Sequence, residues 1–151
     1  MPYIHSQKTR KMTKQIYTCM WFDGQAQAAA HYYCSIFSNS KILSDNPIVT
    51  HVELNGTKFM ALNGGPQYKP TPATSFVIEC ETQQEIDHYW EKLGAGGRYD
   101  RCGWLQDKYG FSWQIVPTIL NTLMADPQSA QRVVAAFMQM SKFDIQALLD
   151  A

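Results

Sequence analysis

The sequence predicts an α+β fold made of two copies of a strand–helix–three-strand (βαβββ) module, followed by a helical tail. The first observation is that strand-like alternation of apolar and polar residues surrounds one helical stretch in each half of the chain. The second is an internal repeat, because His31-Tyr32-Tyr33 recurs as His88-Tyr89-Trp90, 57 residues later (88 minus 31). The third is a pair of turn signals, Asn55-Gly56 and Tyr109-Gly110, 54 residues apart (110 minus 56). Neither module could bury its sheet alone, so the two are expected to pack together.

The first module is predicted to span residues 15–66. Alternation places its strands at residues 16–22, 41–44, 48–54 and 58–63. An Ala-rich helix without Gly or Pro is expected over residues 25–37, starting near Asp23 or Gly24 and burying Ala29, Tyr32, Tyr33 and Ile36. Asn55-Gly56 predicts a tight hairpin between the last two strands. In that hairpin Met60 and Leu62 are assigned to the core, and Phe59, Ala61 and Asn63 to the opposite face.

A Pro-rich linker at residues 67–72 leads to the second module, predicted at residues 73–117. Its first strand is expected over residues 74–80. Thr82 and Glu85 form a capping-box pattern, which predicts a helix that runs to about Leu93 and ends at Gly94–Gly97. The closing hairpin, Cys102–Pro117, is expected to turn Phe111, Trp113 and Ile115 toward this helix, and Gln114 toward the other face.

The two ends of the chain differ from the modules. Residues 118–151 form a predicted helical tail, in which Asp126-Pro127 starts one helix. The apolar residues of the tail favour a core or a subunit contact over a cofactor site. Those of the first helix are Val133, Val134, Phe137, Met138 and Met140, and a last short helix is predicted from Phe143, Ile145, Leu148 and Leu149. Residues 1–14 are basic and lack the apolar segment of an export signal, so they are expected to form a loosely ordered arm. Two alternatives stay open: translation could start at Met12, or the arm could pack on a partner subunit.

Composition excludes several function classes. Lys+Arg and Asp+Glu are both 13, so no basic surplus favours nucleic acid. No apolar run approaches the ~20 residues of a membrane span. The four cysteines lack CxxC spacing, which indicates reduced thiols and a cytoplasmic protein. Aromatic residues make up 13% of the chain, which suggests a cavity or an interface in addition to a core.

Several short motifs carry a resemblance to a known family. They are Met20–Ala26, Phe59–Pro66, Gly103-Trp104-Leu105 and Trp113–Pro117, with Gln131-Arg132-Val133 and Lys142–Ile145 in the tail. Together they resemble the PhnB-like branch of the vicinal oxygen chelate proteins, which include glyoxalase I, bleomycin-resistance proteins and extradiol dioxygenases. The branch carries the label "3-demethylubiquinone-9 3-methyltransferase". The resemblance implies a homodimer and a cupped sheet from each module, with a cavity between the sheets.

In metal-using relatives, the ligands lie on the first and last strands of each module and are usually His, Glu or Gln. The equivalent positions here are Tyr17, Ala61, Ser75 and Gln114, of which only Gln114 is a usual ligand type. The family's metal site and any other cofactor are therefore expected to be absent. The expected function is binding of a small aromatic or oxygenated molecule in the cavity. Its predicted walls are Tyr17, Cys19, Trp21, His51, Glu53, Phe59, Asn63, Ser75, Trp104 and Gln114.

Two other hypotheses stay open. His51 and Glu53 lie two residues apart on one strand and, with Glu79, could hold a displaced divalent metal or supply a catalytic base; a hydrogen-bonded polar cluster is the alternative. The family label suggests methyl transfer. However, neither Asn63–Pro66 nor Gly94–Gly97 stands between a strand and a helix, where a cofactor-binding glycine turn is expected. His5, His31 and His88 are interpreted as surface or boundary residues.

Overall fold

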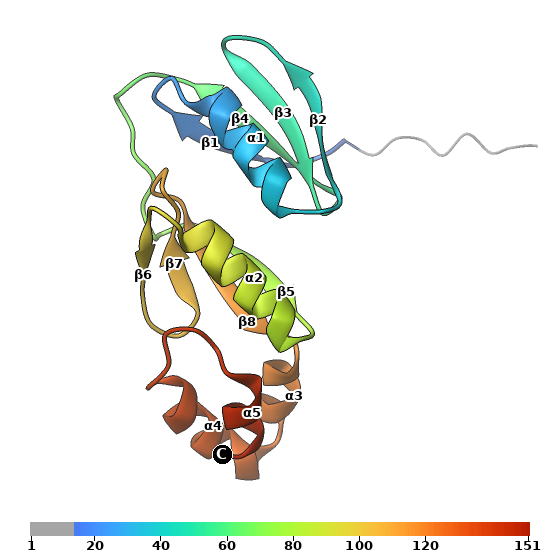
Figure 1. The fold of residues 1–151 in the computed structure, drawn as a ribbon, viewed down its shortest axis with the longest axis vertical. Coiled ribbons are helices and arrows are strands. Elements are labelled where there is room, and N and C mark those ends of the chain that lie inside the picture. Colours follow the sequence, from blue (N-terminus) through green and yellow to red (C-terminus); the bar gives the residue numbers. More distant parts are fainter. Residues whose placement is uncertain (1–13) are drawn as a thin grey trace, which may run out of the picture.

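The computed structural model describes residues 14–151, which form two βαβββ modules and a tail of three helices (Figure 1). The predicted arm lies outside the described residues, except for Lys14. In each module a helix covers one face of a four-stranded sheet, and the α+β class predicted from the sequence is confirmed. Both helices lie on the same side of the molecule, so the uncovered faces of both sheets are turned away from the viewer in Figure 1.

Module 1 contains one helix and four strands. In chain order they are β1 (Thr18–Phe22), α1 (Ala26–Ile36), β2 (Ser40–Asp45), β3 (Val49–Leu54) and β4 (Thr57–Asn63). Its sheet has the order β1-β4-β3-β2, and β1 runs parallel to β4 while the other neighbours are antiparallel. β1 is therefore an edge strand, and its free side faces module 2.

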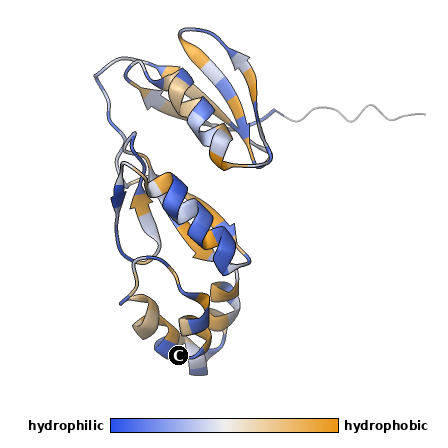
Figure 2. Cartoon of the chain, in the orientation of Figure 1, coloured by the Kyte–Doolittle hydropathy of each residue, from blue (hydrophilic) through white to orange (hydrophobic). Residues whose placement is uncertain are grey.

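Module 2 repeats this arrangement. Its elements are β5 (Ser75–Cys80), α2 (Gln83–Gly94), β6 (Arg98–Tyr99), β7 (Trp104–Gln106) and β8 (Ser112–Pro117). The sheet order is β5-β8-β7-β6, with β5 parallel to β8. The Thr82 hydroxyl accepts a hydrogen bond from the Glu85 backbone N–H, so Thr82 caps α2 as predicted. Figure 2 shows that α2 has a largely hydrophilic outer surface, which agrees with burial of Ile86 and Leu93 on its inner side.

The tail packs against the end of module 2 that is far from module 1 (Figure 1). It consists of α3 (Ile119–Ala125), α4 (Pro127–Phe137) and α5 (Ile145–Leu149). Two backbone hydrogen bonds join it to the turn that precedes β7, from Cys102 N to Met140 O (2.9 Å) and from Gly103 N to Ser141 O (2.7 Å). None of the helices in residues 14–151 has the length and apolarity needed to cross a membrane.

One aromatic core runs through both modules. Tyr33 and Phe37 of α1 have their ring centroids 5.6 and 5.8 Å from that of Trp113 in β8. Phe22 of β1 lies 5.1 Å from Phe111, which precedes β8. Because α1 packs on module 2 and on its own sheet, the contact between the modules is part of the hydrophobic core.

The predicted orientation of β4 is wrong. Phe59 and Ala61 are buried on the α1 face, with exposed fractions of 9% and 3%, and Met60 lies on the uncovered face. The two-residue turn sets this register, because it places Val52 opposite Phe59 and Thr50 opposite Ala61. Directly opposed residues share one face of a sheet, so Phe59 and Ala61 must face the core together with Val52 and Thr50.

Candidate functional site

Three neighbouring hollows follow the seam between the two modules. The central one, which we call the seam hollow, has a volume of about 300 Å³. It shares Thr18 and Phe76 with a hollow of about 400 Å³ along the edge of β5. On its other side it shares Trp21, Tyr68, Lys69 and Pro70 with a hollow of about 280 Å³. The seam hollow is lined by Thr18, Cys19, Met20, Trp21, Tyr68, Lys69, Pro70, Thr71, Thr74, Phe76 and Phe111.

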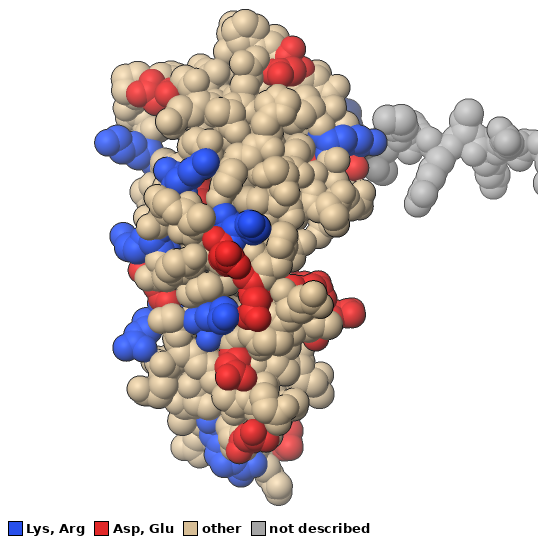
Figure 3. All heavy atoms as spheres, viewed as in Figure 1, with Lys and Arg blue, Asp and Glu red and all other residues tan. Residues whose placement is uncertain are grey.

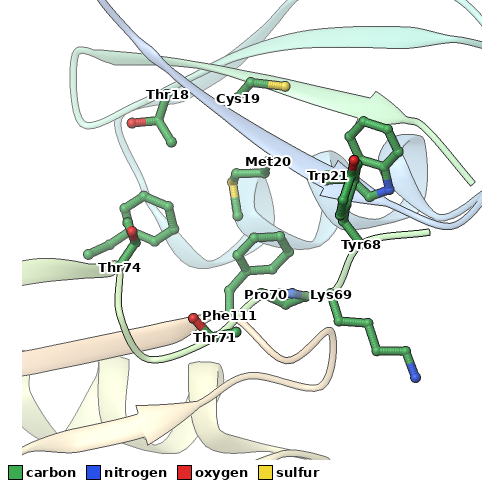
Figure 4. Close-up of a pocket in the computed structure, with 11 residues that line it drawn as sticks. Thr18, Cys19, Met20, Trp21, Tyr68, Lys69, Pro70, Thr71, Thr74 and Phe111 are labelled. Carbon is green, nitrogen blue, oxygen red and sulfur yellow. The ribbon is translucent and has the colours of Figure 1, made fainter. Parts of the chain in front are cut away.

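Figure 4 shows how these side chains are arranged. Met20 projects from β1 toward the Phe111 ring, so both modules contribute apolar walls. Thr18 and Thr74 supply hydroxyl groups at one end, and Trp21 lies with Tyr68 at the other. The Lys69 side chain runs away from the hollow. Burial raises the pKa of the Cys19 thiol, so this group stays neutral near pH 7.

The linker forms part of the wall because Trp21 holds it in place. The Trp21 indole Nε1 donates a hydrogen bond to Gly65 O (2.9 Å), and the Tyr68 ring meets the indole edge-on with a centroid distance of 5.0 Å. Gly64 lies so close that a Cβ atom there would be 2.3 Å from the Trp21 ring. Only glycine, which has no Cβ atom, allows the backbone to pass this close to the indole ring.

The opposite wall is fixed by Asp107, a buried carboxylate that sequence analysis did not identify. Its Oδ1 accepts hydrogen bonds from the backbone N–H groups of Tyr109 (2.8 Å) and Phe111 (3.1 Å). Its Oδ2 accepts from the Tyr33 hydroxyl (2.5 Å) and the Trp113 indole (2.9 Å). Since Tyr33 belongs to α1, one carboxylate joins the two modules and positions Phe111.

Burial is the largest cause of the pKa shifts of Asp107 and Tyr33. Asp107 is 2% exposed, and desolvation raises the pKa of its carboxyl even though four donors oppose that shift. Burial, together with the neighbouring carboxylate, raises the pKa of Tyr33 well above its usual value. Near pH 7 the Tyr33 phenol is therefore a hydrogen-bond donor, which matches its role in holding α1 to module 2.

The ten residues predicted to line one cavity are distributed over several surfaces. Cys19 and Trp21 line the seam hollow, and Phe59 and Ser75 line the hollow along β5. Tyr17 borders a separate hollow of about 230 Å³. The remaining five border none of these four hollows in the described part of the chain. They are His51, Glu53, Asn63, Trp104 and Gln114.

Asn63 has a structural role instead. Its side-chain Oδ1 accepts a hydrogen bond from Ala26 N at the start of α1 (2.8 Å), and its Nδ2 donates to Pro47 O (2.9 Å). Neither Asp23 nor Gly24 caps the helix, because the N-cap residue is Gln25 and its side chain makes no capping bond. The cap therefore comes from the end of β4, on the α1 side of the sheet.

The positions equivalent to the family's metal ligands do not fit a divalent ion. Ala61 is buried on the core face and has no donor atom. Gln114 Nε2 donates to Ser75 Oγ (2.9 Å), so these two neutral groups bind each other. The Lys58 ammonium lies 4.3 Å from the centroid of the Tyr17 ring, and this cation would repel a second one. None of these residues is an ionised donor, and divalent ions in proteins require several of them.

The residues of the displaced-metal hypothesis do not all converge. His51 and Glu53 share the uncovered face of β3, as predicted, but Glu79 lies on β5 in the other sheet. His51 Nδ1 is hydrogen-bonded to Ser44 Oγ (2.9 Å). Glu53 stands opposite Lys41 in β2 and Lys58 in β4. Within residues 14–151, no group of three or more His, Cys, Asp or Glu is arranged to hold a metal ion.

The histidines of the repeat lie in the two helices. His88 Nε2 meets Ile36 O at 2.9 Å, where α2 passes the end of α1. His31 is largely exposed and lies 3.8 Å from Asp45. Neither side chain borders the seam hollow. His5 lies outside the described residues.

Comparison with known proteins agrees with this fold. The family model described as 3-demethylubiquinone-9 3-methyltransferase matches residues 14–116. A structure described as a putative 3-demethylubiquinone-9 3-methyltransferase, PhnB protein, from Bacillus cereus is 32% identical, with a TM-score of 0.64; the match covers 70% of this chain and 100% of that one. No protein with a curated description matches the chain.

More distant structures share the fold alone. Protein PA1353 from Pseudomonas aeruginosa is 15% identical with a TM-score of 0.58, and the match covers 70% of this chain and 98% of that one. The fosfomycin resistance protein FosX from Listeria monocytogenes, complexed with Mn(II) and sulfate, is 11% identical with a TM-score of 0.55, covering 76% of this chain and 98% of that one. The tail lies beyond the family model, which ends at residue 116. The doubled βαβββ fold, the family model and the 32% identical relative together show that this chain belongs to the family described as 3-demethylubiquinone-9 3-methyltransferase, the PhnB-like branch of the vicinal oxygen chelate superfamily.

Proposed function

We propose that this protein binds a small, largely apolar molecule in the seam hollow and does so without a metal ion. The observation that carries the proposal is the lining of this hollow, to which Met20, Phe76 and Phe111 contribute apolar side chains from both modules. A concave, mainly apolar site with a few polar groups is typical of small-molecule binding. The volume of about 300 Å³ is at the lower end of the range for such sites and suits a molecule of one or two rings.

The chemistry of the remaining residues supports a metal-free site. The Gln114 side chain donates a hydrogen bond to the Ser75 hydroxyl, and Ala61 is buried. The Tyr17 ring lies beside the ammonium group of Lys58. These positions would need several substitutions before they resembled a divalent-metal site. The proposed binding therefore depends on shape and apolar contact between the modules.

Indole NMR signals can test this function, because Trp21 borders the seam hollow and Trp104 lies on β7, away from it. We expect one- and two-ring aromatic compounds to shift the ¹⁵N–¹H indole signal of Trp21 and to leave that of Trp104 unchanged. Treatment with EDTA should not alter the response. A shift of Trp104 alone, or a response that disappears with EDTA, would refute the proposal.

The displaced-metal enzyme makes a different prediction. If His51 and Glu53 bound a divalent ion, protein purified without chelator would contain about one ion per chain, and His51→Ala would lose it. Ser44, the hydrogen-bond partner of His51, provides the matched control as Ser44→Ala. We expect no stoichiometric metal in any of the three proteins.

The family label would require binding of S-adenosylmethionine. Asn63–Pro66 follows β4 and enters the linker, and Gly94–Gly97 lies between α2 and β6. Neither turn stands between a strand and a helix, where backbone N–H groups at a helix start would meet the cofactor. We therefore expect calorimetry to detect no S-adenosylmethionine binding.

We also propose a cytoplasmic homodimer. All four cysteines are free thiols, which suits a reducing compartment. Met124, Met138 and Leu149 of the tail are 38%, 56% and 50% exposed, and they give the tail an apolar surface for a subunit contact. Light scattering should give twice the chain mass, whereas a monomer at high concentration would contradict this proposal.

A further inference from the structure

We propose that the seam hollow selects uncharged aromatic molecules and rejects their charged analogues. This inference rests on the proposed function and adds the chemical class of the ligand. Its basis is the distribution of charge around the hollow, because the apolar walls alone would accept many molecules.

The wall of the seam hollow offers little counter-charge to a bound ion. Of its eleven lining residues, Lys69 has the only side chain that is charged near pH 7, and this side chain runs away from the space (Figure 4). Figure 3 shows that acidic and basic side chains are spread over both modules on the side of the molecule that α1 and α2 cover. An ion bound against Met20, Phe76 and Phe111 would lose the water on that side and gain no partner, which is costly, whereas an uncharged ring would not incur this cost.

Apart from Lys69, the polar side chains that line the hollow are uncharged, and three of them are threonines, Thr18, Thr71 and Thr74. Thr18 and Thr74 lie at the end opposite Trp21, one from each module (Figure 4). A hydroxyl can donate or accept a hydrogen bond, so these threonines can pair with a neutral hydroxyl or carbonyl on a ligand. The ring itself would lie against Met20, Phe76 and Phe111, where sulfur and aromatic faces favour aromatic contacts. The predicted ligand is therefore a flat, neutral ring system with one oxygen substituent.

Three probes of equal ring size test the inference: 2-naphthol, 2-naphthoate and 2-naphthylmethylammonium, titrated calorimetrically near pH 7. We expect 2-naphthol to bind at least about tenfold more tightly than either ion. Thr74→Lys should reverse this order in favour of naphthoate, since it adds a cation to the wall. Val77→Lys, on the exposed side of β5 and outside the seam hollow, is the matched control and should leave the order unchanged.

The outcomes separate the two proposals. Similar affinities for all three probes, together with a shifted Trp21 signal, would overturn the charge selection and leave the seam hollow as a binding site. Binding of 2-naphthol that persists in Thr74→Trp, where the new ring would fill the hollow, would place the site elsewhere. No binding of any probe would overturn both proposals. Circular dichroism of each variant shows whether it is folded.

Discussion

At the scale of single residues, Asp107 connects the two modules through its carboxylate. Its carboxylate accepts four hydrogen bonds, and one of them comes from Tyr33, 74 residues earlier in the chain. Asp107→Asn would replace one acceptor oxygen with a donor amide, which cannot pair with the N–H donors of Tyr109, Phe111 and Trp113. We expect a loss of roughly 1–3 kcal/mol in the free energy of unfolding, because buried donors would be left unpaired.

Urea unfolding of the two proteins measures this loss. Asp100→Asn is the control, since the Asp100 side chain is 39% exposed and pairs with Arg98 near the surface. Substitutions at such positions usually change stability by less than about 0.5 kcal/mol. Equal stability of the wild type and Asp107→Asn would show that the carboxylate does not anchor the modules.

The same residue predicts a pH dependence. Burial raises the pKa of Asp107 above its unfolded value of about 3.9, so the folded state binds the proton more tightly than the unfolded state. Its titration therefore adds stability that is fully present below the unfolded pKa and is lost as pH rises through the folded pKa. The difference in unfolding free energy between the wild type and Asp107→Asn should shrink over that interval. A difference that grows with pH would mean that the four hydrogen bonds outweigh burial.

At the scale of elements, Gly103 fixes the tail to module 2. A Cβ atom at this position would lie 2.6 Å from both Ile115 O and the Phe143 ring, and the residue has a φ of +79°. Gly103→Ala would therefore push the tail away from β8 and would strain the backbone. We expect a loss of more than about 2 kcal/mol in unfolding free energy, measured by urea denaturation.

Gly24→Ala separates the two causes. Gly24 has nearly the same φ, +78°, but a Cβ atom there would meet nothing within 4 Å. Its substitution should cost only the backbone strain, about 1–2 kcal/mol. If both variants lose the same stability, the close approach of the tail to Gly103 contributes nothing.

Elements were predictable from the sequence where their signals are local. Local patterns located every strand except the two-residue β6 within a few residues, and Thr82 marked the start of α2. The orientation of β4 was missed because it depends on the register across the Asn55-Gly56 turn. The cap of α1 by Asn63 was missed because 37 residues separate Asn63 from Ala26. The site was only partly predictable for the same reason, since Cys19 and Trp21 meet Thr74 and Phe111 only after the modules pack.

At the scale of the whole molecule, the shared core predicts that the two modules unfold together. The rings of Tyr33, Phe37 and Trp113 cross the seam, so module 1 could not unfold without exposing aromatic surface of module 2. That exposure makes a state with only one folded module unfavourable.

Indole NMR signals recorded through a urea titration can measure this coupling. Trp21 reports on module 1 and Trp104 on module 2, and we expect both native signals to disappear with one midpoint. In Asp107→Asn the common midpoint should fall without splitting, because the aromatic contacts remain. Loss of Trp21 at a clearly lower urea concentration than Trp104 would show that the modules are independent. The seam would then be too weak to hold a ligand site in a fixed shape.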